Sequence, residues 1–348
     1  MDINLLNIIV SQFNIDISNI TFKTIAQGYI NDTFLVEKNS EPKYILQRIN
    51  NNVFKNISGL HKNIEHSLSK LKAKDYSNIS LLKTKTDKVY YIHNNSFWRL
   101  MTFIPKSIAH NITSNPKIAF EAGRVIGRFH HLLKDENLNS YEDTFPNLNH
   151  LPFWAKEFHK TLELTNNKLK TKAKSEIDFA IKNLGRFDAF YAADLPKRIC
   201  HNDTKLNNFL FDANDKGLCL IDLDTIMEGY FHYDFGDVVR TVVSEANEDE
   251  KDLSKIKFKT HLFEALINGI SSNGSLLNRI EQDYLPISCA LMPFMNGLRA
   301  LSDYLNGNIH YKVSYPEQNL DRCKSLFQFA RLAIDRQTDI KTIIDNKL

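Results

Sequence analysis

The sequence predicts an α+β protein with a small β-rich N-terminal lobe and a larger helical C-terminal lobe. Three observations predict this division. Roughly the first hundred residues contain short strand-like runs around one helical pattern, amphipathic helical patterns dominate after Pro105, and a short β island interrupts them from Arg198 to Asp222. A chain of 348 residues is long enough for two domains. We therefore expect an N-terminal lobe at 1–104 and a C-terminal lobe at 105–348.

The N-terminal lobe begins with a predicted β-hairpin. Strand-like runs at 21–26 and 33–38 flank the turn-rich segment QGYIND, and 43–49 is a third strand. Between residues 51 and 74, apolar residues recur every three or four positions, which indicates one face of a helix. Three further β-like runs follow, NISLLKT, KVYYIH and FWRLMTFI.

The C-terminal lobe is predicted to be mainly helical. The segment 116–133 is strongly amphipathic, and 153–184 predicts one long helix or two. Helical patterns return after Tyr233. Close packing between helices explains the glycines and histidines of the first helix without any ligand: Gly123, Gly127, His130 and His131.

The composition excludes several classes of protein. Lysine and arginine number 44 against 41 aspartate and glutamate residues, and a net charge of +3 gives no basis for a nucleic-acid partner. The four cysteines form no C-x-x-C pair, so we expect buried, reduced thiols. The N-terminus lacks the basic n-region of a signal peptide, and no apolar run is long enough to span a membrane. We expect a cytoplasmic protein, a monomer or weak homodimer, without nucleic-acid or membrane partners.

The segment HNDTKLNNFLFD at 201–212 is the most informative stretch of the chain. Its polar half separates the strand-like run KRIC from FLFD, and the turn ANDKG leads to a return strand, LCLID. This hairpin would bring Asp222 back beside Asn208, with Asp203 nearby. Carboxylate and amide oxygens around a small volume suit Mg²⁺ that also binds phosphate oxygens.

The same stretch resembles the protein-kinase catalytic loop, H-x-D-x-K-x-x-N, residue for residue: His201, Asp203, Lys205 and Asn208. The resemblance implies that Asp203 is the catalytic base or hydroxyl orienter. Lys205 would neutralise the transferring phosphoryl group, while Asn208 and Asp222 would hold Mg²⁺. His201 would pack and fix the loop.

A literal DFG tripeptide occurs at 234–236, but it lies 12 residues beyond Asp222 and opens a helix. An Asp near a helix start is more simply a cap. In the related small-molecule kinases an Asp at this place braces the catalytic loop, and the resemblance assigns that role to Asp234. The metal-binding Asp is then Asp222, with Asp224 as an auxiliary.

The order of a β lobe, a hinge and a helical lobe with a catalytic β-hairpin resembles the aminoglycoside phosphotransferase and choline kinase group, which has a protein-kinase-like fold. Four stretches are more narrowly similar to the N-acetylhexosamine 1-kinases: QGYINDTFLV, YILQRIN, CHNDTKLNNFLFD with LIDLDTIMEGYFHYDFGDVVR, and LRALSDYLNGNIHYKV. This resemblance implies an enzyme that uses ATP and Mg²⁺ to phosphorylate the anomeric hydroxyl of a sugar, N-acetylglucosamine or N-acetylgalactosamine.

The nucleotide site departs from the protein-kinase pattern. The strand that should carry the ATP-binding lysine reads YILQRIN, so Gln47 or Arg48 takes its place, depending on register. Arg48 could contact phosphate or be an exposed edge residue. Glu65 is the only acid between Glu41 and Asp75, hence the sole candidate for a helix-to-strand ion pair. The residues expected at ATP are Gly28, Asn31, Thr33, Arg48, Met101 and Phe103.

The late segment LRALSDYLNGNIHYKV is the candidate acceptor site. Its positive and aromatic groups suit a sugar better than a polycation, which would need several carboxylates. We expect Arg299, Asp303 and Tyr311 to bind the acceptor beside Asp203, although the first two could form an ordinary helix surface pair. Two alternatives stay open: a kinase of aminoglycoside, choline or homoserine type, and a non-catalytic kinase-like protein that binds nucleotide, motivated by the missing lysine.

Overall fold

The computed structural model describes residues 2–25 and 30–348, so Gly28 lies outside the described residues. The chain forms two compact units, and the α+β fold class is confirmed. Unit 1 comprises Met1–Ser107, Asn137–Pro146 and Leu223–Met227, and unit 2 comprises Ile108–Glu136, Asn147–Asp222 and Glu228–Leu348. The assignment of 1–104 and 105–348 as functional lobes stays a prediction.

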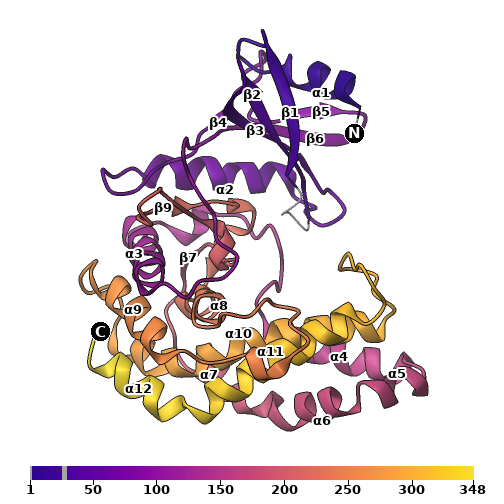
Figure 1. The fold of residues 1–348 in the computed structure, drawn as a ribbon, viewed down its shortest axis with the longest axis vertical. Helices are drawn as coiled ribbons and strands as arrows, with labels where there is room; N and C mark the ends of the chain where they lie inside the picture. The colour runs from indigo at the N-terminus through magenta and orange to yellow at the C-terminus, as the bar shows by residue number, and fades with distance from the viewer. Residues whose placement is uncertain (1, 26–29) are drawn as a thin grey trace. The chain divides into compact units, whose positions relative to one another are not determined.

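Unit 1 is built on an antiparallel sheet in the order β1-β2-β3-β6-β4, with β5 also paired to β6 (Figure 1). The strands are β1 (Ile20–Ile25), β2 (Asp32–Lys38), β3 (Glu41–Ile49), β4 (Leu81–Leu82), β5 (Tyr91–His93) and β6 (Ser96–Thr102). The predicted helix is α2 (Ile57–Lys70), where the Asn56 side chain accepts a hydrogen bond from the Gly59 backbone N–H.

A helix that the sequence patterns did not predict, α1 (Ile3–Val10), packs on one face of this sheet. The two faces alternate along each strand, because successive side chains point in opposite directions. The apolar core of unit 1 lies between α1 and the sheet and contains Leu6, Ile9, Val10, Phe13, Phe34, Val36, Leu46, Trp98 and Leu100.

Unit 2 is mostly helical, as predicted. Its helices are α3 (Pro116–Leu132), α4 (Leu151–Leu164), α5 (Asn167–Lys172), α6 (Lys174–Asn183), α7 (Asp188–Ala192), α8 (Phe231–Val242), α9 (Thr260–Ser271), α10 (Arg279–Leu305), α11 (Gln318–Asp335) and α12 (Gln337–Asp345). Short 3-10 helices lie at Leu138–Ser140, Leu184–Phe187, Leu206–Asn208, Leu223–Thr225 and Leu253–Lys255.

The expectation of one or two helices over 153–184 is wrong, because this fully described segment is divided among α4, α5 and α6. Asn166 causes the first break. Its side chain accepts a hydrogen bond from the Leu169 N–H at 3.0 Å, which caps a new helix.

The β island lies where the sequence placed it. Its strands are β7 (Arg198–Cys200), β8 (Phe209–Phe211) and β9 (Gly217–Leu220), followed by β10 (Met227–Gly229). Strands β8 and β9 form the predicted antiparallel hairpin, with Phe209 opposite Leu220. A separate small sheet pairs β7 with β10.

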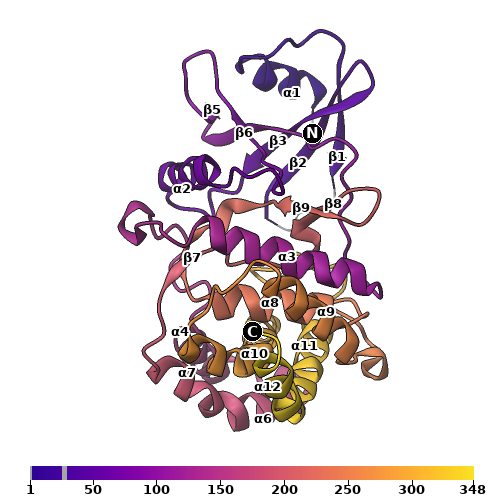
Figure 2. The same ribbon diagram turned by 90° about the vertical axis from the view of Figure 1, so that its left-hand side faces the viewer.

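Helices α3 and α9 cross in close contact (Figure 2). A Cβ atom added to Gly123 would lie 2.0 Å from the Leu266 carbonyl oxygen, and one added to Gly269 would lie 1.9 Å from that of Phe120. The packing interpretation of Gly123 is therefore confirmed.

The four cysteines are free and buried, as expected: Cys200, Cys219, Cys289 and Cys323. Across the described part of the chain, none of the helices combines the length and the apolar character that a membrane span requires.

Candidate active site

The β8–β9 hairpin positions the polar loop of residues 201–208. The Ile221 N–H donates to the Asn208 carbonyl at 2.9 Å, and a ring nitrogen of His201 lies 2.8 Å from the Ile221 carbonyl. Asp222 follows Ile221, so these contacts place it at the end of the hairpin, and Asn208 lies at the start of the same hairpin.

Asp203 is the central acceptor of this loop. Its Oδ2 oxygen lies 2.7 Å from the Lys205 ammonium and 3.1 Å from the Asn208 amide nitrogen. Burial would raise the pKa of the Asp203 carboxyl, but Lys205 outweighs it, and the net pKa is lower than usual. Burial acts to lower the pKa of Lys205. The neighbouring carboxylates, Asp203 first, act to raise it, and the net effect is a raised pKa. Both side chains are therefore charged at neutral pH.

Asn208 and Asp222 have the chemistry that a magnesium site requires. The Asn208 amide nitrogen also donates to the Asp203 carbonyl at 2.7 Å, which turns the Asn208 Oδ1 oxygen away from that group. Asp222 is exposed and has a φ of 62°, a left-handed conformation that non-glycine residues rarely adopt. An amide oxygen and an exposed carboxylate at one corner fit a hard divalent cation.

Asp234 is buried beneath the loop. Its carboxylate accepts hydrogen bonds from the backbone N–H groups of His201 at 2.8 Å and Asn202 at 2.7 Å. A ring nitrogen of His130 lies 2.9 Å from the same carboxylate. The expectation that His130 only packs is therefore incomplete, because it contacts the residue that holds the loop. Cys200 completes a buried cluster with possible metal-ligand atoms, but burial raises the pKa of its thiol well above normal.

Unit 1 contains a separate buried polar cluster on the sheet face opposite α1. The β3–β6 register sets Gln47 against Arg99, whose Nε and Nη2 donate to the Gln47 side-chain oxygen at 2.9 and 2.6 Å. Arg99 also forms an ion pair with Asp224, and the two side chains are 1% and 3% exposed. The cation on this face is therefore Arg99 of β6, which the sequence patterns did not predict.

Arg48 and Glu65 lie elsewhere. Arg48 pairs with Asp32 across β2 and β3 and lies 6.0 Å from the centre of the Trp98 ring, on the α1 side of the sheet. Glu65 is on the exposed face of α2. Glu65, the sole candidate from the sequence for a helix-to-strand ion pair, is therefore not the partner of the buried Arg99, which pairs with Asp224 instead.

The other nucleotide candidates lie on or next to strands β2 and β6 of unit 1. Asn31 donates to the Asp224 Oδ2 oxygen at 2.7 Å, and Thr33 accepts a hydrogen bond from Gln47 at 3.1 Å. Since Arg99 binds the other oxygen of Asp224, that carboxylate is fully engaged within unit 1. Met101 pairs with Ile45 one residue before the end of β6, and Phe103 lies just beyond the strand, both half-buried.

The acceptor candidates are positioned by α10 and the segment after it. Arg299 lies 4.8 Å from the centre of the Trp154 ring on α4, a contact that the sequence did not predict. Asp303 is buried and accepts backbone N–H hydrogen bonds from the segment 309–311 and one from the Asn319 amide. Its carboxylate thus holds the loop that carries Tyr311.

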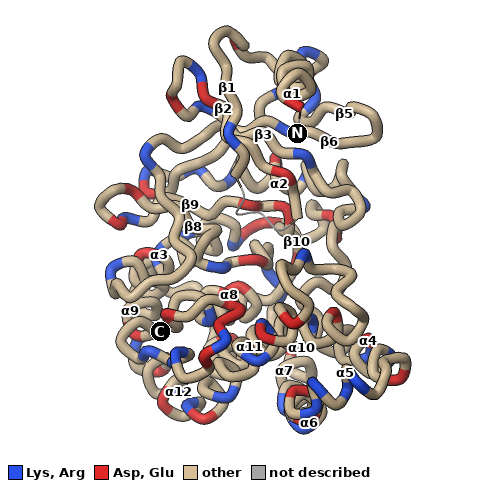
Figure 3. Tube along the Cα trace, turned by 45° about the vertical axis from the view of Figure 1, so that its right-hand side comes forward, with Lys and Arg blue, Asp and Glu red and all other residues tan. Residues whose placement is uncertain are grey.

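An alternating chain of charges runs from α8 to α11. Arg240 pairs with Asp237 and with Glu248, each at 2.7 Å, and Arg322 lies 3.3 Å from Glu248. Asp237 and Lys205 influence each other's pKa, which connects this chain electrostatically to the catalytic loop. Figure 3 shows the acidic and basic positions along the backbone.

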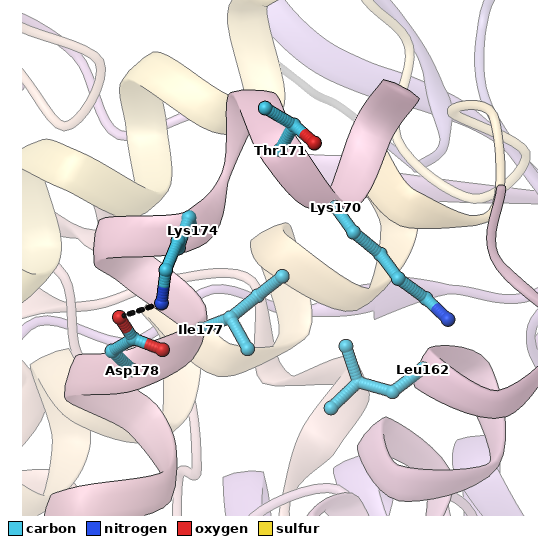
Figure 4. Close-up of a pocket in the computed structure, with 6 residues that line it drawn as sticks. All are labelled: Leu162, Lys170, Thr171, Lys174, Ile177 and Asp178. Atoms are coloured by element: carbon cyan, nitrogen blue, oxygen red, sulfur yellow. Dashed lines mark hydrogen bonds and ion pairs between the residues drawn. The ribbon is translucent and has the colours of Figure 1, made fainter. Parts of the chain in front are cut away.

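A surface pocket of about 370 Å³ lies between α4, α5 and α6 (Figure 4). Lys174 pairs with Asp178 at 2.6 Å along its wall. Its lining residues are Leu162, Lys170, Thr171, Lys174, Ile177 and Asp178. None of these six belongs to the predicted site.

Comparison with known proteins identifies the fold. A microcompartment-associated aminopropanol kinase is 14% identical, with a TM-score of 0.66 over 98% of this chain and 99% of its own. An aminoglycoside phosphotransferase from Alicyclobacillus acidocaldarius is 11% identical, with a TM-score of 0.64 over 97% and 96%. An amicoumacin kinase in complex with AMP-PNP and Ca²⁺ is 14% identical, with a TM-score of 0.59 over 97% and 94%.

The predicted protein-kinase-like fold is thus confirmed. The sequence also matches the family model described as the phosphotransferase enzyme family over residues 21–253, which is more than half of the chain. The protein therefore belongs to this family, that of the aminoglycoside phosphotransferases, and is a small-molecule phosphotransferase that acts on a hydroxyl group.

Proposed function

We propose that the protein transfers the γ-phosphoryl group of ATP to the anomeric hydroxyl of an N-acetylhexosamine, N-acetylglucosamine or N-acetylgalactosamine, with Mg²⁺. The observation that carries the phosphoryl-transfer part is the arrangement of Asp203, Lys205 and Asn208 at the start of a hairpin that ends at Asp222. The amicoumacin kinase, which shares the fold, binds a nucleotide analogue and a divalent cation.

Each residue of the loop has a defined task in this mechanism. Asp203, kept ionised by Lys205, orients the acceptor hydroxyl and takes its proton. Lys205, whose ammonium lies 2.7 Å from the Asp203 carboxylate, would balance charge on the phosphoryl group. Asn208 and Asp222 would hold Mg²⁺, which supplies charge neutralisation at the phosphate oxygens. Asp234 fixes the backbone of His201 and Asn202, which keeps Asp203 in place.

The acceptor part of the proposal is supported by the balance of charge near the loop. Apart from Asp222, which we assign to Mg²⁺, the three carboxylates Asp203, Asp237 and Glu248 are matched by three cations. Those cations are Lys205, Arg240 and Arg322. A polycationic acceptor would find no net negative charge among these six groups, whereas a neutral sugar finds many hydrogen-bond partners. Trp154 and Tyr311 add aromatic faces near the Arg299 and Asp303 segment.

The decisive experiment is an acceptor panel. Purified protein is incubated with ATP, Mg²⁺ and one of N-acetylglucosamine, N-acetylgalactosamine, glucose, choline, homoserine, 1-aminopropan-2-ol and kanamycin. We expect a sugar 1-phosphate, identified by phosphorus NMR, from the two N-acetylhexosamines. Efficient phosphorylation of an amine, with the hexosamines inert, would reject the sugar assignment in favour of another small-molecule kinase. Absence of turnover with every acceptor would favour the non-catalytic alternative.

A further inference from the structure

Glu248 is an exposed carboxylate held between two buried arginines in the loop between α8 and α9. Arg240 on α8 donates to its Oε2 oxygen at 2.7 Å, and the Nε of Arg322 on α11 lies 3.3 Å from its Oε1 oxygen. Each arginine side chain is 6% exposed, whereas that of Glu248 is 39% exposed. Two desolvated cations thus present one accessible anion to solvent.

The loop around Glu248 is fixed on α11 rather than loosely placed. The Gln318 amide donates to Asp249 at 2.9 Å, and the Ser325 hydroxyl donates to the Asn247 carbonyl at 3.3 Å. The Lys251 ammonium lies 4.0 Å from the centre of the Tyr315 ring. Contacts on both sides of Glu248 therefore pre-organise its carboxylate, a property expected of a recognition group.

Glu248 also belongs to the surroundings of the catalytic loop. The surrounding protein partly desolvates this carboxylate, which acts to raise its pKa, but Arg240, Arg322 and more weakly Lys205 lower the pKa, so the carboxylate stays ionised at neutral pH. Lys205 is the partner of Asp203 at 2.7 Å. Between them, the Asp237 Oδ2 oxygen is buried and, among the described residues, accepts no hydrogen bond. Asp203 and Glu248 are thus connected by a series of charged side chains, Lys205, Asp237 and Arg240.

The chemistry of this arrangement selects neutral donors. Because two arginines already balance Glu248, a cationic ligand gains little Coulomb energy, but a hydroxyl or amide N–H still gains a charge-assisted hydrogen bond. The Arg322 guanidinium lies 5.2 Å from the centre of the Tyr311 ring, which provides an apolar face beside the polar group. Hydroxyls, an acetamido N–H and an apolar face are what an N-acetylated sugar offers.

We propose that Glu248, fixed by Arg240 and Arg322, is an acceptor-recognition residue that accepts hydrogen bonds from ring hydroxyls or the acetamido N–H of a sugar whose anomeric hydroxyl lies at Asp203. This inference rests on the proposed function. It adds a specificity-determining residue outside the segment 299–311.

The test compares Glu248→Gln with Glu245→Gln. Glu245 lies on the same loop, is 37% exposed and also pairs with a cation, Lys259 at 3.4 Å, so it is a matched control. We expect Glu248→Gln to raise the KM for the acceptor about 10- to 100-fold, the loss of one charged hydrogen bond, with kcat and the KM for ATP changed less than about threefold. Glu245→Gln should leave all three unchanged.

Deoxygenated sugars locate the contact. The wild-type protein should lose affinity for the analogue that lacks the hydroxyl bound by Glu248, and that loss should shrink to near zero in Glu248→Gln, because the partner is already gone. An unchanged acceptor KM in Glu248→Gln, or an equal rise in the KM for ATP, would overturn the inference. If this variant melts early, Glu248→Asp, which keeps the charge and withdraws the oxygens, should show the same selective rise in acceptor KM.

Failure of the inference and failure of the proposed function give different results. If the hexosamines are phosphorylated normally by Glu248→Gln, the function stands and the recognition role falls. If the wild-type protein phosphorylates only another acceptor of the panel, the sugar assignment falls. The same comparison with that acceptor then decides the role of Glu248: a selective KM rise supports it and an unchanged KM rejects it.

Discussion

Asp203 carries a negative charge and can take up a proton, and an amide at the same place can do neither. Its carboxylate accepts from Lys205 at 2.7 Å and from Asn208 at 3.1 Å, and it is the proposed acceptor of the hydroxyl proton. We expect Asp203→Asn to lower kcat about 10²- to 10⁴-fold, the range for loss of a general base. Titration with a fluorescent ATP analogue should show nearly unchanged nucleotide affinity. Turnover close to wild type in a pure, folded sample would contradict the assignment.

Asp222 and Asp234 should respond differently to alanine. Asp222 is exposed, so Asp222→Ala should lower the melting temperature only slightly, but it should abolish both the Mg²⁺-dependent activity and the Mg²⁺ binding that calorimetry measures. Asp234 is fully buried and accepts two backbone N–H hydrogen bonds, so Asp234→Ala should lower stability by about 3–5 kcal/mol by leaving buried donors unpaired. Selective loss of Mg²⁺ binding in a stable Asp234→Ala protein would reverse the two roles.

Site residues that lie close together in the sequence could be predicted from their spacing alone. The positions of Asp203, Lys205 and Asn208 follow from one loop, and the hairpin that returns Asp222 follows from turn residues a few positions apart. Contacts between distant segments carry no such signal. Nothing in the helical pattern of α3 indicates that His130 contacts Asp234, 104 residues later.

Unit 1 has a buried ion pair, Arg99–Asp224, on one face of its sheet and a more exposed pair, Arg48–Asp32, on the other face. Arg99→Met leaves Asp224 buried without its cation and should lower the free energy of unfolding by about 3–5 kcal/mol. Arg48→Met breaks an Arg–Asp pair whose side chains are 41% and 34% exposed, and it should cost less than about 1 kcal/mol. Urea denaturation of both variants tests this, and equal losses would argue against the buried pair.

Strand alternation explains why the lysine position was ambiguous in the sequence. Gln47 and Arg48 are neighbours, so a shift of one residue exchanges the faces on which their side chains lie. The structure places Gln47 with Arg99 and Arg48 with Asp32. An arginine inside the apolar run FWRLMTFI was the available signal for a buried partner, since such a cation is rarely buried alone.

At the scale of the whole molecule, the buried histidines His61 and His232, one in each unit, make the protein less stable as the pH falls. Burial lowers the pKa of both His61 and His232 to about 4. Both are neutral in the folded protein, and the unfolded chain takes up more protons between about pH 6.5 and pH 4. The contribution of each neutral histidine to the free energy of unfolding is therefore fully present above about pH 6.5. It is lost as the pH falls toward 4, which lowers the free energy of unfolding by up to about 3 kcal/mol for each histidine.

Urea denaturation between pH 4 and pH 7.5 measures this effect. His61→Gln should reduce the fall in the free energy of unfolding by the share that His61 contributes, because the variant has no imidazole to protonate at that position. A wild-type profile that is already flat across this range would contradict the two buried neutral histidines.

The whole-molecule arrangement was the least predictable from the sequence. The segments 137–146 and 223–227 belong to unit 1, although they lie far along the chain. Asn63 of α2 holds both, with hydrogen bonds to the Glu142 and Ile226 carbonyls at 2.8 and 2.9 Å. Its position on a helix face that also carries apolar residues gave no indication of either partner.

The crossing of α3 and α9 affects how mutational data on this enzyme should be interpreted. No side chain larger than hydrogen fits at Gly123 or Gly269 without moving a backbone carbonyl. A growth-based scan of all substitutions should therefore score these two glycines as severely as Asp203. The cause is different, since such variants are depleted by degradation of unfolded chains rather than by a slow chemical step. Only a parallel measurement of cellular abundance separates the two classes.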